Sequence, residues 1–412
     1  MGRGWVSPSP TQPERTKGEM DKVLSKLKIL GLPSDAAACG LYRVVWPLQV
    51  LQSAGLAETY VPPIVNGDRF VKLSEEGYKS PNDPSTVNNY DLIVLQRQPQ
   101  KDVHRLITGA KALGIRVVFD IDDNAVAIQP SNPNYMVWGK DRRKIRSMVT
   151  AYMESGSVPK AIRGKSVDEV VESSMSLRNS LLNNIRAADM VTVTTPSLKE
   201  DYSRYNNNIV ILPNQMPIDL WKDLEYIPHE GRVWVGWAGG WTHYEDLKLI
   251  KAAMREVIRR HDSVDLVLIG FDQAKDLVFD DISPDRVVTF PWSKDLAGYR
   301  KYVNSLDVAL APSYDSRFNE GKSSIRCLEA WCCKVPVVGS FTTYGHAIRE
   351  SGGGIVAKKP KDWIKGLSRL ISNKGLRASM GIAGYNYTSK RRTYAVTTGL
   401  WFSAYKSLFD GG

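Results

Sequence analysis

The sequence predicts an α/β fold built from two doubly wound, Rossmann-like domains that face a central cleft. Three observations predict it: a length of 412 residues, an alternation of short apolar runs with amphipathic stretches, and a restart of that alternation after about residue 230. A chain of this length usually forms more than one domain. Strands that alternate with helices imply parallel sheets covered on both faces.

The first alternating stretch predicts a domain over residues 21–218. Strands are expected in KLKILGL, DLIVLQR, IRVVFDIDD, DMVTVTT and NIVILPN, and helices in YRVVWPLQVLQSAG, VHRLITGAKALG, SLRNSLLNNIRAA and LKEDYSRY. Residues 125–175 fit no clean periodicity. Residues 1–20 are rich in Pro, Gly, Ser and charge and contain no apolar run of signal-peptide length, so we expect a flexible tail there.

The second stretch predicts a domain over residues 233–378, joined by a linker over 219–232. Its expected strands are VWVGWAGG, VDLVLIG, VVTFPW, DVALAP and VPVVGS, and its expected helices are DLKLIKAAMREVIRRH, LAGYRKYVNSL, SSIRCLEAWCC and a stretch near 361–376. Ligands of open parallel sheets bind beyond the carboxyl ends of the strands. Two facing sheets therefore predict a cleft with one substrate on each side.

Composition narrows the class of protein. The formal net charge is +11, but eleven Lys and Arg against two Asp and Glu fall within residues 358–412, so the remainder is near neutral. This distribution favours an enzyme with a basic terminal helix, residues 379–412, over a DNA-binding body. The four cysteines show no metal-site or disulfide spacing, which favours core packing in a reducing cytoplasm. No apolar run reaches the roughly 20 residues that a membrane span needs.

The segment FNEGKSSIRCLEAWCCKVPVVGS, residues 318–340, carries the strongest chemical signal. Its turn enters a predicted helix after a strand, so the amides near Gly321 and the helix dipole would suit a diphosphate. Lys322 adds a positive charge, and Ser323 and Ser324 can cap the helix or donate to an oxygen. Glu329, nearly two turns later, could accept hydrogen bonds from ribose hydroxyls.

These residues resemble the donor-site motif of the GT-B glycosyltransferases of retaining family 4. Residues 328–330 and 336–338 correspond to the family's Leu-Glu-Ala and Pro-Val-Val segments. The first glutamate of the family's motif corresponds to Gly321 in this sequence, with Glu320 one position earlier. An ATPase P-loop is excluded, because its first glycine would fall on Ser316.

A second segment, VGWAGGWTHYEDL over residues 235–247, resembles the glycine turn of the same family. There Gly239 and Gly240 would let the backbone approach the donor phosphates, and His243 would contact the donor. The resemblance covers about residues 26–380, and it implies that the basic terminal helix over residues 379–412 packs back on the first domain. It implies transfer of a sugar from a nucleoside-diphosphate sugar, with retention, without an obligatory metal or other cofactor, to an unknown acceptor: a glycan, a protein or a modified nucleic acid.

The first domain supplies the candidate acceptor residues. Asp122 and Asp123 follow a strand and are expected to orient or deprotonate an acceptor hydroxyl, unless one of them only caps the next turn. A strand followed by Asp-x-Asp is also the metal signature of GT-A glycosyltransferases, in which Asp120 and Asp122 would hold the ion.

Three further residues, Tyr42, Arg43 and Arg97, lie at strand or helix ends and are expected either to bind the acceptor or to pack in ion pairs. Two other classes of function stay open. A binding module would keep the fold without turnover, and a protein acting on nucleic acid would use the basic cluster KDRRKIR, residues 140–146, and the basic terminus. That terminus could also lie on a membrane surface.

Overall fold

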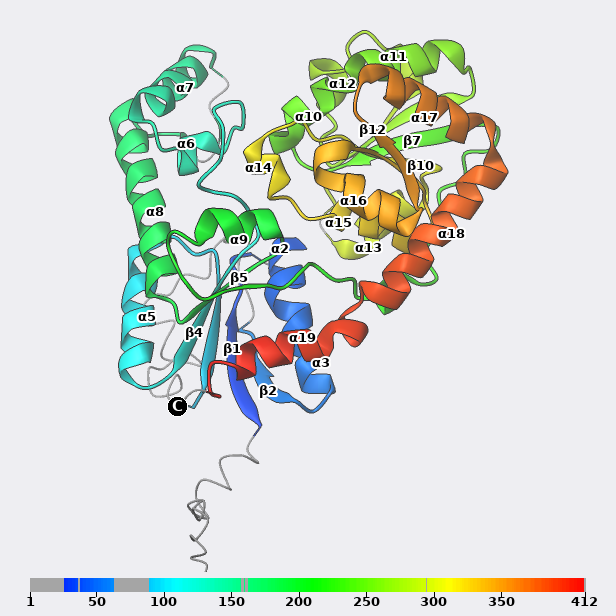
Figure 1. Ribbon diagram of the computed structural model, residues 1–412. Coiled ribbons are helices and arrows are strands. Elements are labelled where there is room, and N and C mark those ends of the chain that lie inside the picture. Colours follow the sequence, from blue (N-terminus) through cyan, green and yellow to red (C-terminus); the bar gives the residue numbers. More distant parts are fainter. Residues whose placement is uncertain are drawn as a thin grey trace, which may run out of the picture.

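The protein is described from a computed structural model of the 412-residue chain. The structure describes residues 26–35, 38–62, 89–156, 159, 162–293 and 295–410, so the predicted tail over residues 1–20 lies outside the described residues. Two α/β domains lie next to each other, and a long helix, α18 (Lys374–Arg391), runs from the second domain back toward the first (Figure 1).

The first domain has a six-stranded parallel sheet with the order β2-β1-β3-β4-β5-β6. Its strands are β1 (Leu27–Leu32), β2 (Ala57–Tyr60), β3 (Leu92–Gln96), β4 (Arg116–Ile121), β5 (Met190–Val193) and β6 (Ile209–Ile211). Its helices are α2 (Ala38–Gly40), the π-helix η1 (Leu41–Val45), α3 (Trp46–Ser53), α5 (Lys101–Ala112), α6 (Tyr135–Trp138), α7 (Arg142–Glu154), α8 (Val167–Ala187) and α9 (Pro196–Tyr202). The strand order reverses between β1 and β3, which opens a crevice at their carboxyl ends.

The second domain repeats this architecture with the order β9-β8-β7-β10-β11-β12, all parallel. Its strands are β7 (Val233–Ala238), β8 (Val264–Ile269), β9 (Val287–Phe290), β10 (Val308–Ala311), β11 (Val337–Ser340) and β12 (Gly354–Ala357). Its helices are η5 (Trp241–His243), α10 (Tyr244–Lys248), α11 (Lys251–Arg260), α12 (Ala274–Leu277), η6 (Pro284–Arg286), α13 (Leu296–Asn304), α14 (Arg317–Glu320), α15 (Ile325–Cys332), α16 (Phe341–Ser351) and α17 (Pro360–Ser372). This is the Rossmann strand order, and its switch point lies between β7 and β10.

The predicted two-domain α/β architecture is confirmed, although the edges of both sheets differ from the sequence prediction. Strands β2 and β12 were not predicted, because AETY is polar and GIVA is a four-residue run that begins with glycine. Backbone pairing of β2 with β1 and of β12 with β11 holds these segments as strands, although their own sequences have a weak preference for that conformation. Helices α6 and α7 occupy part of the stretch without clean periodicity, and they pack against α8 in a small apolar cluster of their own.

Two segments cross between the domains, and they lie side by side. After β6 the chain passes through residues 212–217 and the 3-10 helix η4 (Ile218–Trp221) toward β7, and after α18 it returns into α19 (Tyr394–Lys406). The Met216 amide donates to the carbonyl of Arg392, 2.8 Å away, and Met216 pairs with Thr393. The two segments that cross between the domains therefore stabilise each other through backbone contacts.

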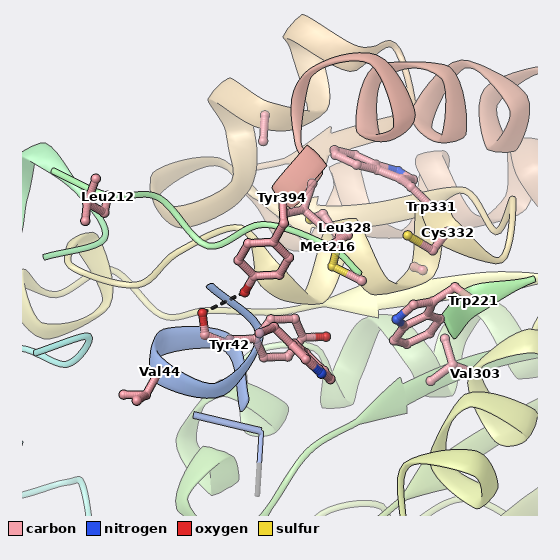
Figure 2. Packing of buried hydrophobic residues seen from close by; sticks show 14 of the residues in the cluster. Tyr42, Val44, Leu212, Met216, Trp221, Val303, Leu328, Trp331, Cys332 and Tyr394 are labelled. Atoms are coloured by element: carbon pink, nitrogen blue, oxygen red, sulfur yellow. Dashed lines mark hydrogen bonds between the residues drawn. The ribbon is translucent and has the colours of Figure 1, made fainter. Parts of the chain in front are cut away.

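A hydrophobic cluster spans the boundary between the domains (Figure 2). It includes Tyr42 and Val44 from η1, Leu212 and Met216 from the crossing segment, Leu328 and Trp331 from α15, and Tyr394 from α19. The Tyr394 hydroxyl donates to the Tyr42 carbonyl at 2.6 Å, and Trp401 and Tyr405 are each 1% exposed. The basic C-terminal helix therefore packs on the first domain, against α3 and η1.

The bond between Tyr394 and Tyr42 leads to a stability prediction. Tyr394→Phe leaves a buried carbonyl without its donor, so we expect the free energy of unfolding to fall by about 1–3 kcal/mol. Chemical denaturation measures this change. Tyr387→Phe is the matched control, since its hydroxyl bonds to Glu350 at an exposed site and its loss should cost about 0.5 kcal/mol or less. Equal costs for the two variants would show that the terminal helix is not anchored through Tyr394.

Candidate active site

A cavity of about 600 Å³ lies between the two domains, at the carboxyl ends of their strands. This volume is typical of sites for small-molecule ligands. The first domain contributes Asp35, Cys39, Tyr42, Asp122 and Asp123 to its lining. The second domain contributes Gly239, His243, Trp292, Lys322, Arg326 and Glu329. Both switch points therefore open into one space, as two facing sheets require.

Lys322 and Asp123 form an ion pair across the cavity, with 2.5 Å between Nζ and Oδ1. Burial alone would raise the pKa of the Asp123 carboxyl, but the Lys322 ammonium and the Arg97 guanidinium outweigh burial and lower that pKa to about 2. Burial by itself would lower the pKa of the Lys322 ammonium. The neighbouring Asp123 carboxylate has the larger, opposite effect, so the pKa is raised above its ordinary value. Both groups are therefore charged at neutral pH.

The turn that carries Lys322 differs from the predicted amide nest. The amides of Gly321 and Lys322 donate to the carbonyls of Phe318 and Asn319, at 3.2 and 3.1 Å, and so complete the short helix α14. The Gly321 carbonyl accepts a bond from the hydroxyl of Thr195 in the first domain, 3.1 Å away. Gly321 therefore forms an interdomain contact, and the amides that remain for an anion belong to the first turn of α15.

Arg326 is a cavity residue that the sequence analysis did not select. It lies four residues after Lys322, in the first turn of α15, and its guanidinium packs over the Trp237 ring, 5.3 Å from the ring centroid. Nη1 of Arg326 is buried and has no hydrogen-bond partner among the described residues. A Cβ on Gly239 would lie 2.6 Å from Trp237 and 3.0 Å from Arg326, so this packing requires glycine. A buried, unpaired guanidinium nitrogen is a donor prepared for an anionic ligand.

Glu329 lies deeper in the cavity and is held by two tyrosines. The Tyr42 hydroxyl donates to Oε1 at 3.0 Å, and the Tyr299 hydroxyl donates to Oε2 at 2.7 Å. Burial raises the pKa of Glu329, against the effect of both hydrogen bonds. Because each carboxylate oxygen can accept more than one hydrogen bond, this arrangement leaves acceptor capacity for a ligand hydroxyl.

His243 follows the glycine turn after β7, and its ring is held by a buried carboxylate. Nδ1 lies 2.7 Å from Oδ2 of Asp246. Burial lowers the pKa of His243, and the nearby Arg326 guanidinium lowers it further, against the effect of Asp246. The imidazole is therefore neutral at pH 7.

The first-domain side of the cavity carries a cluster of carboxylates joined by Arg97. Its guanidinium reaches Asp35 at 3.2 Å, Asp122 at 3.5 Å and Asp123 at 3.3 Å. Arg97 has φ 30°, an uncommon conformation for a residue with a side chain. Burial and the neighbouring Asp123 raise the pKa of Asp122, although Arg97 opposes the shift. The two adjacent carboxyls therefore have pKa values shifted in opposite directions.

Residues 232–373, which include β7–β12 and all the cationic groups of the cavity, match the family described as Glycosyl transferases group 1. The C-terminal domain is a group 1 glycosyltransferase domain. The chain is therefore a glycosyltransferase. No curated protein matches the chain significantly in sequence.

Solved structures show the fold of this glycosyltransferase. Sucrose-phosphate synthase from Thermosynechococcus elongatus is similar with a TM-score of 0.61 and 15% identity over 94% of this chain and 100% of that chain. HepE from Anabaena, solved with UDP-glucose, has a TM-score of 0.55 and 12% identity over 92% and 100%. WaaG, a glycosyltransferase involved in lipopolysaccharide biosynthesis, has a TM-score of 0.51 and 14% identity over 94% and 100%. The two-domain arrangement is that of the GT-B fold.

Arg43 of the glycosyltransferase does not reach the cavity, contrary to its predicted acceptor role. It is 0% exposed and pairs with the equally buried Asp120, Nη2 to Oδ2, at 2.6 Å. Nη1 donates to the Leu212 carbonyl at 2.6 Å and to Asn214 at 3.0 Å. Arg43 is thus a structural residue, because its guanidinium is enclosed by protein partners.

The same pair contradicts the alternative in which Asp120 and Asp122 hold a metal ion. Both oxygens of Asp120 accept bonds from Arg43, and Oδ2 also accepts from Thr192 at 2.7 Å. Asp120 is therefore enclosed by protein partners and does not line the cavity, in contrast to Asp122. Within the described ranges, no cluster of three or more His, Cys, Asp or Glu is arranged to hold a metal ion.

Of the other predicted residues, Gly240, Ser324 and Glu320 lie near the cavity without lining it. Gly240 precedes η5, and its carbonyl accepts from the His243 amide at 3.1 Å. Ser324 begins α15 without a side-chain cap, whereas Ser323 lines the cavity and accepts from Asn214 of the first domain at 2.9 Å. Glu320 pairs with Arg317 on the surface.

The basic cluster over residues 140–146 begins α7. Arg142 and Arg146 pair there with Glu172 and Asp168 of α8, which reduces the free positive charge of the cluster. None of the helices in the described ranges is both long and apolar enough to cross a membrane.

Proposed function

We propose that this glycosyltransferase transfers a sugar from a nucleoside-diphosphate sugar to an acceptor hydroxyl, with retention of anomeric configuration, and that the donor lies on the C-terminal side of the cavity. The observation that supports it best is the pair of cations, Lys322 and Arg326, which lie four residues apart in the chain and both line the cavity. Charge-assisted bonds from the two side chains would neutralise a diphosphate without a metal ion. Retention rests on the resemblance to retaining family 4.

The nucleoside end of the donor is assigned to the deeper part of the cavity. Glu329 would accept hydrogen bonds from the ribose hydroxyls, while Tyr42 and Tyr299 keep its carboxylate in place. Trp292 also lines the cavity and is 64% exposed, so its ring offers an open aromatic face on which a nucleobase can stack. HepE, which has the same fold, was solved with UDP-glucose, and uridine is therefore the first base to test.

The acceptor is assigned to the side of the cavity formed by the first domain. Asp122 and Asp123 would orient its hydroxyl, and a carboxylate that accepts a hydroxyl proton acts as a general base. The diphosphate would compete with Asp123 for Lys322, so donor binding releases the Asp123 carboxylate toward the acceptor. Carboxylates at this position favour an acceptor that presents uncharged hydroxyls rather than phosphates.

Donor binding can be tested without knowledge of the acceptor. A ligand that binds only the folded state stabilises it, by about 2.7 kcal/mol at one hundred times its dissociation constant. We expect one of UDP-, GDP- or ADP-glucose to raise the melting temperature of the wild type. Glu329→Gln removes one ribose-accepting oxygen, so it should weaken the same donor about tenfold or more and reduce the shift at equal concentration.

The matched control for Glu329→Gln is Glu225→Gln, an exposed glutamate that pairs with Lys301 on the surface. It should keep the full donor-induced shift. If no nucleotide sugar of a broad panel raises the melting temperature, the proposed function is wrong. A shift that is equal in wild type and Glu329→Gln would show that the ribose lies elsewhere.

A further inference from the structure

A second, smaller cavity of about 60 Å³ adjoins the main one and is polar. Asp123, His243 and Lys322 line both cavities and therefore lie at their junction. Beyond them the small cavity is lined by Asn132 and Asn134 of the first domain and by Thr242 and Glu245 of the second. Its amide, hydroxyl and carboxylate groups are suited to a ligand that carries several hydroxyls.

His243 is the neutral group at this junction, and Asp246 determines how its ring is held. The Asp246 side chain is 6% exposed, and its Oδ1 already accepts from the Tyr314 amide at 2.9 Å and from Asn319 Nδ2 at 3.0 Å. Its Oδ2 faces Nδ1 of His243 at 2.7 Å. An ionised carboxylate can only accept hydrogen bonds, so Nδ1 must carry the proton of the neutral ring.

The remaining ring nitrogen, Nε2, is therefore a hydrogen-bond acceptor. It has no hydrogen-bond partner in the part of the chain that the structure describes. The charged groups that act on His243 are Arg326, Lys322, Asp123 and Asp246. Two cations and a buried site keep the ring from protonating, so the lone pair of Nε2 stays available near pH 7.

We propose that Asp246 is a positioning residue that holds His243 as the Nδ1–H tautomer, so that Nε2 accepts a hydrogen bond from a hydroxyl of the transferred sugar. This rests on the proposed function, in which Lys322 binds the diphosphate. Because Lys322 also lines the small cavity, the sugar attached to that diphosphate extends into it, past His243. Asp246 acts only through His243 and does not itself touch the sugar.

Nitrogen-15 NMR of histidine tests the tautomer directly. The chain has five histidines, and the spectrum of His243→Asn assigns the signal that is lost. At pH 8, where the ring is neutral, the wild type should show a protonated Nδ1 and a bare Nε2. In Asp246→Asn the new amide must still accept from Tyr314 and Asn319, so its NH2 group turns to His243. Nδ1 then loses its proton, and the tautomer reverses.

The functional consequence is measured in the same variants. Asp246→Asn should bind UDP, or whichever nucleoside diphosphate the wild type binds, within about twofold, because this ligand has no sugar. The gain in affinity from the attached sugar should fall about tenfold, and kcat/KM with it, which corresponds to about 1.4 kcal/mol. His243→Asn keeps a donor to Asp246 but lacks Nε2, and it should show the same loss while the melting temperature is kept.

The outcomes separate the two proposals. A protonated Nε2 in the wild type, or an unchanged tautomer and unchanged sugar affinity in Asp246→Asn, would overturn the inference about His243 even if a nucleotide sugar binds. If Asp246→Asn does not fold, His243→Asn decides, and full sugar affinity in that variant overturns the inference. If the wild type binds no nucleotide sugar, the proposed function is contradicted, and the contact between His243 and the sugar is contradicted with it. The NMR measurement of the His243 tautomer does not depend on that result.

Discussion

Lys322→Ala is expected to lower kcat about 100- to 1,000-fold while donor affinity falls much less. Charge on the diphosphate grows as its bond to the sugar breaks, so a cation beside it stabilises the transition state more than the bound donor. Loss of one such group commonly costs two to three orders of magnitude, or about 3–4 kcal/mol. Steady-state kinetics with the donor identified by thermal shift, together with direct donor binding, separates the two effects.

The ion pair with Asp123 adds a control to this experiment. The folded state holds the pKa of Asp123 at about 2, below its usual 3.8, so the stabilisation from the pair is complete above pH 4 and is lost as the pH falls toward 2. Assays at pH 7 therefore begin with the pair intact. In the Lys322→Ala background, Asp123→Asn should cost less than it does in the wild type, because the two residues act on one step.

Lys251→Ala serves as the matched control for Lys322→Ala. This lysine is also on the second domain and in an ion pair, with Asp280, but it lies on the surface. Its removal should leave kcat and donor affinity unchanged, as for most exposed pairs. If Lys322→Ala keeps wild-type turnover, the diphosphate does not lie at the Lys322 turn.

The second large effect concerns stability, and it arises at Arg43. Arg43→Ala would leave the Asp120 carboxylate fully buried without its cation, which typically costs about 3–5 kcal/mol. The variant also loses the donors to Leu212 and Asn214, at the segment that crosses between the domains. We therefore expect a strongly lowered denaturation midpoint, measured by urea unfolding of the isolated protein.

Two comparisons make the Arg43 result interpretable. Arg142→Ala removes a surface pair with Glu172 and should cost about 1 kcal/mol or less. The double variant Arg43→Met with Asp120→Leu removes both buried charges and should recover part of the loss, since apolar replacements of a buried pair are often tolerated. An Arg43→Ala cost as small as that of Arg142→Ala would mean that Asp120 finds another partner.

Local patterns in the sequence determined much of the fold. The apolar runs of the central strands β3, β8 and β10 are buried throughout, because parallel strands are covered on both faces and need no alternation. The turn with Lys322 and the carboxylates after β4 could be placed at the cleft for the same reason: the carboxyl ends of parallel strands meet at one edge. The positions of these strands and of the residues that follow them can be predicted from local sequence, because strand length, spacing and turn residues are short-range features.

What the tertiary structure alone decided is which of the candidate groups face the ligand and which face each other. Tyr42 meets Glu329 across 287 positions of the chain, and Arg43, its neighbour, turns to Asp120 instead of the cleft. Both residues looked alike in the sequence, as polar groups at the start of a helix. Burial distinguishes the two residues. A buried guanidinium is costly unless it pairs with a carboxylate, and the fold places Asp120 beside Arg43. Such partners are distant in sequence, so no local pattern reveals them.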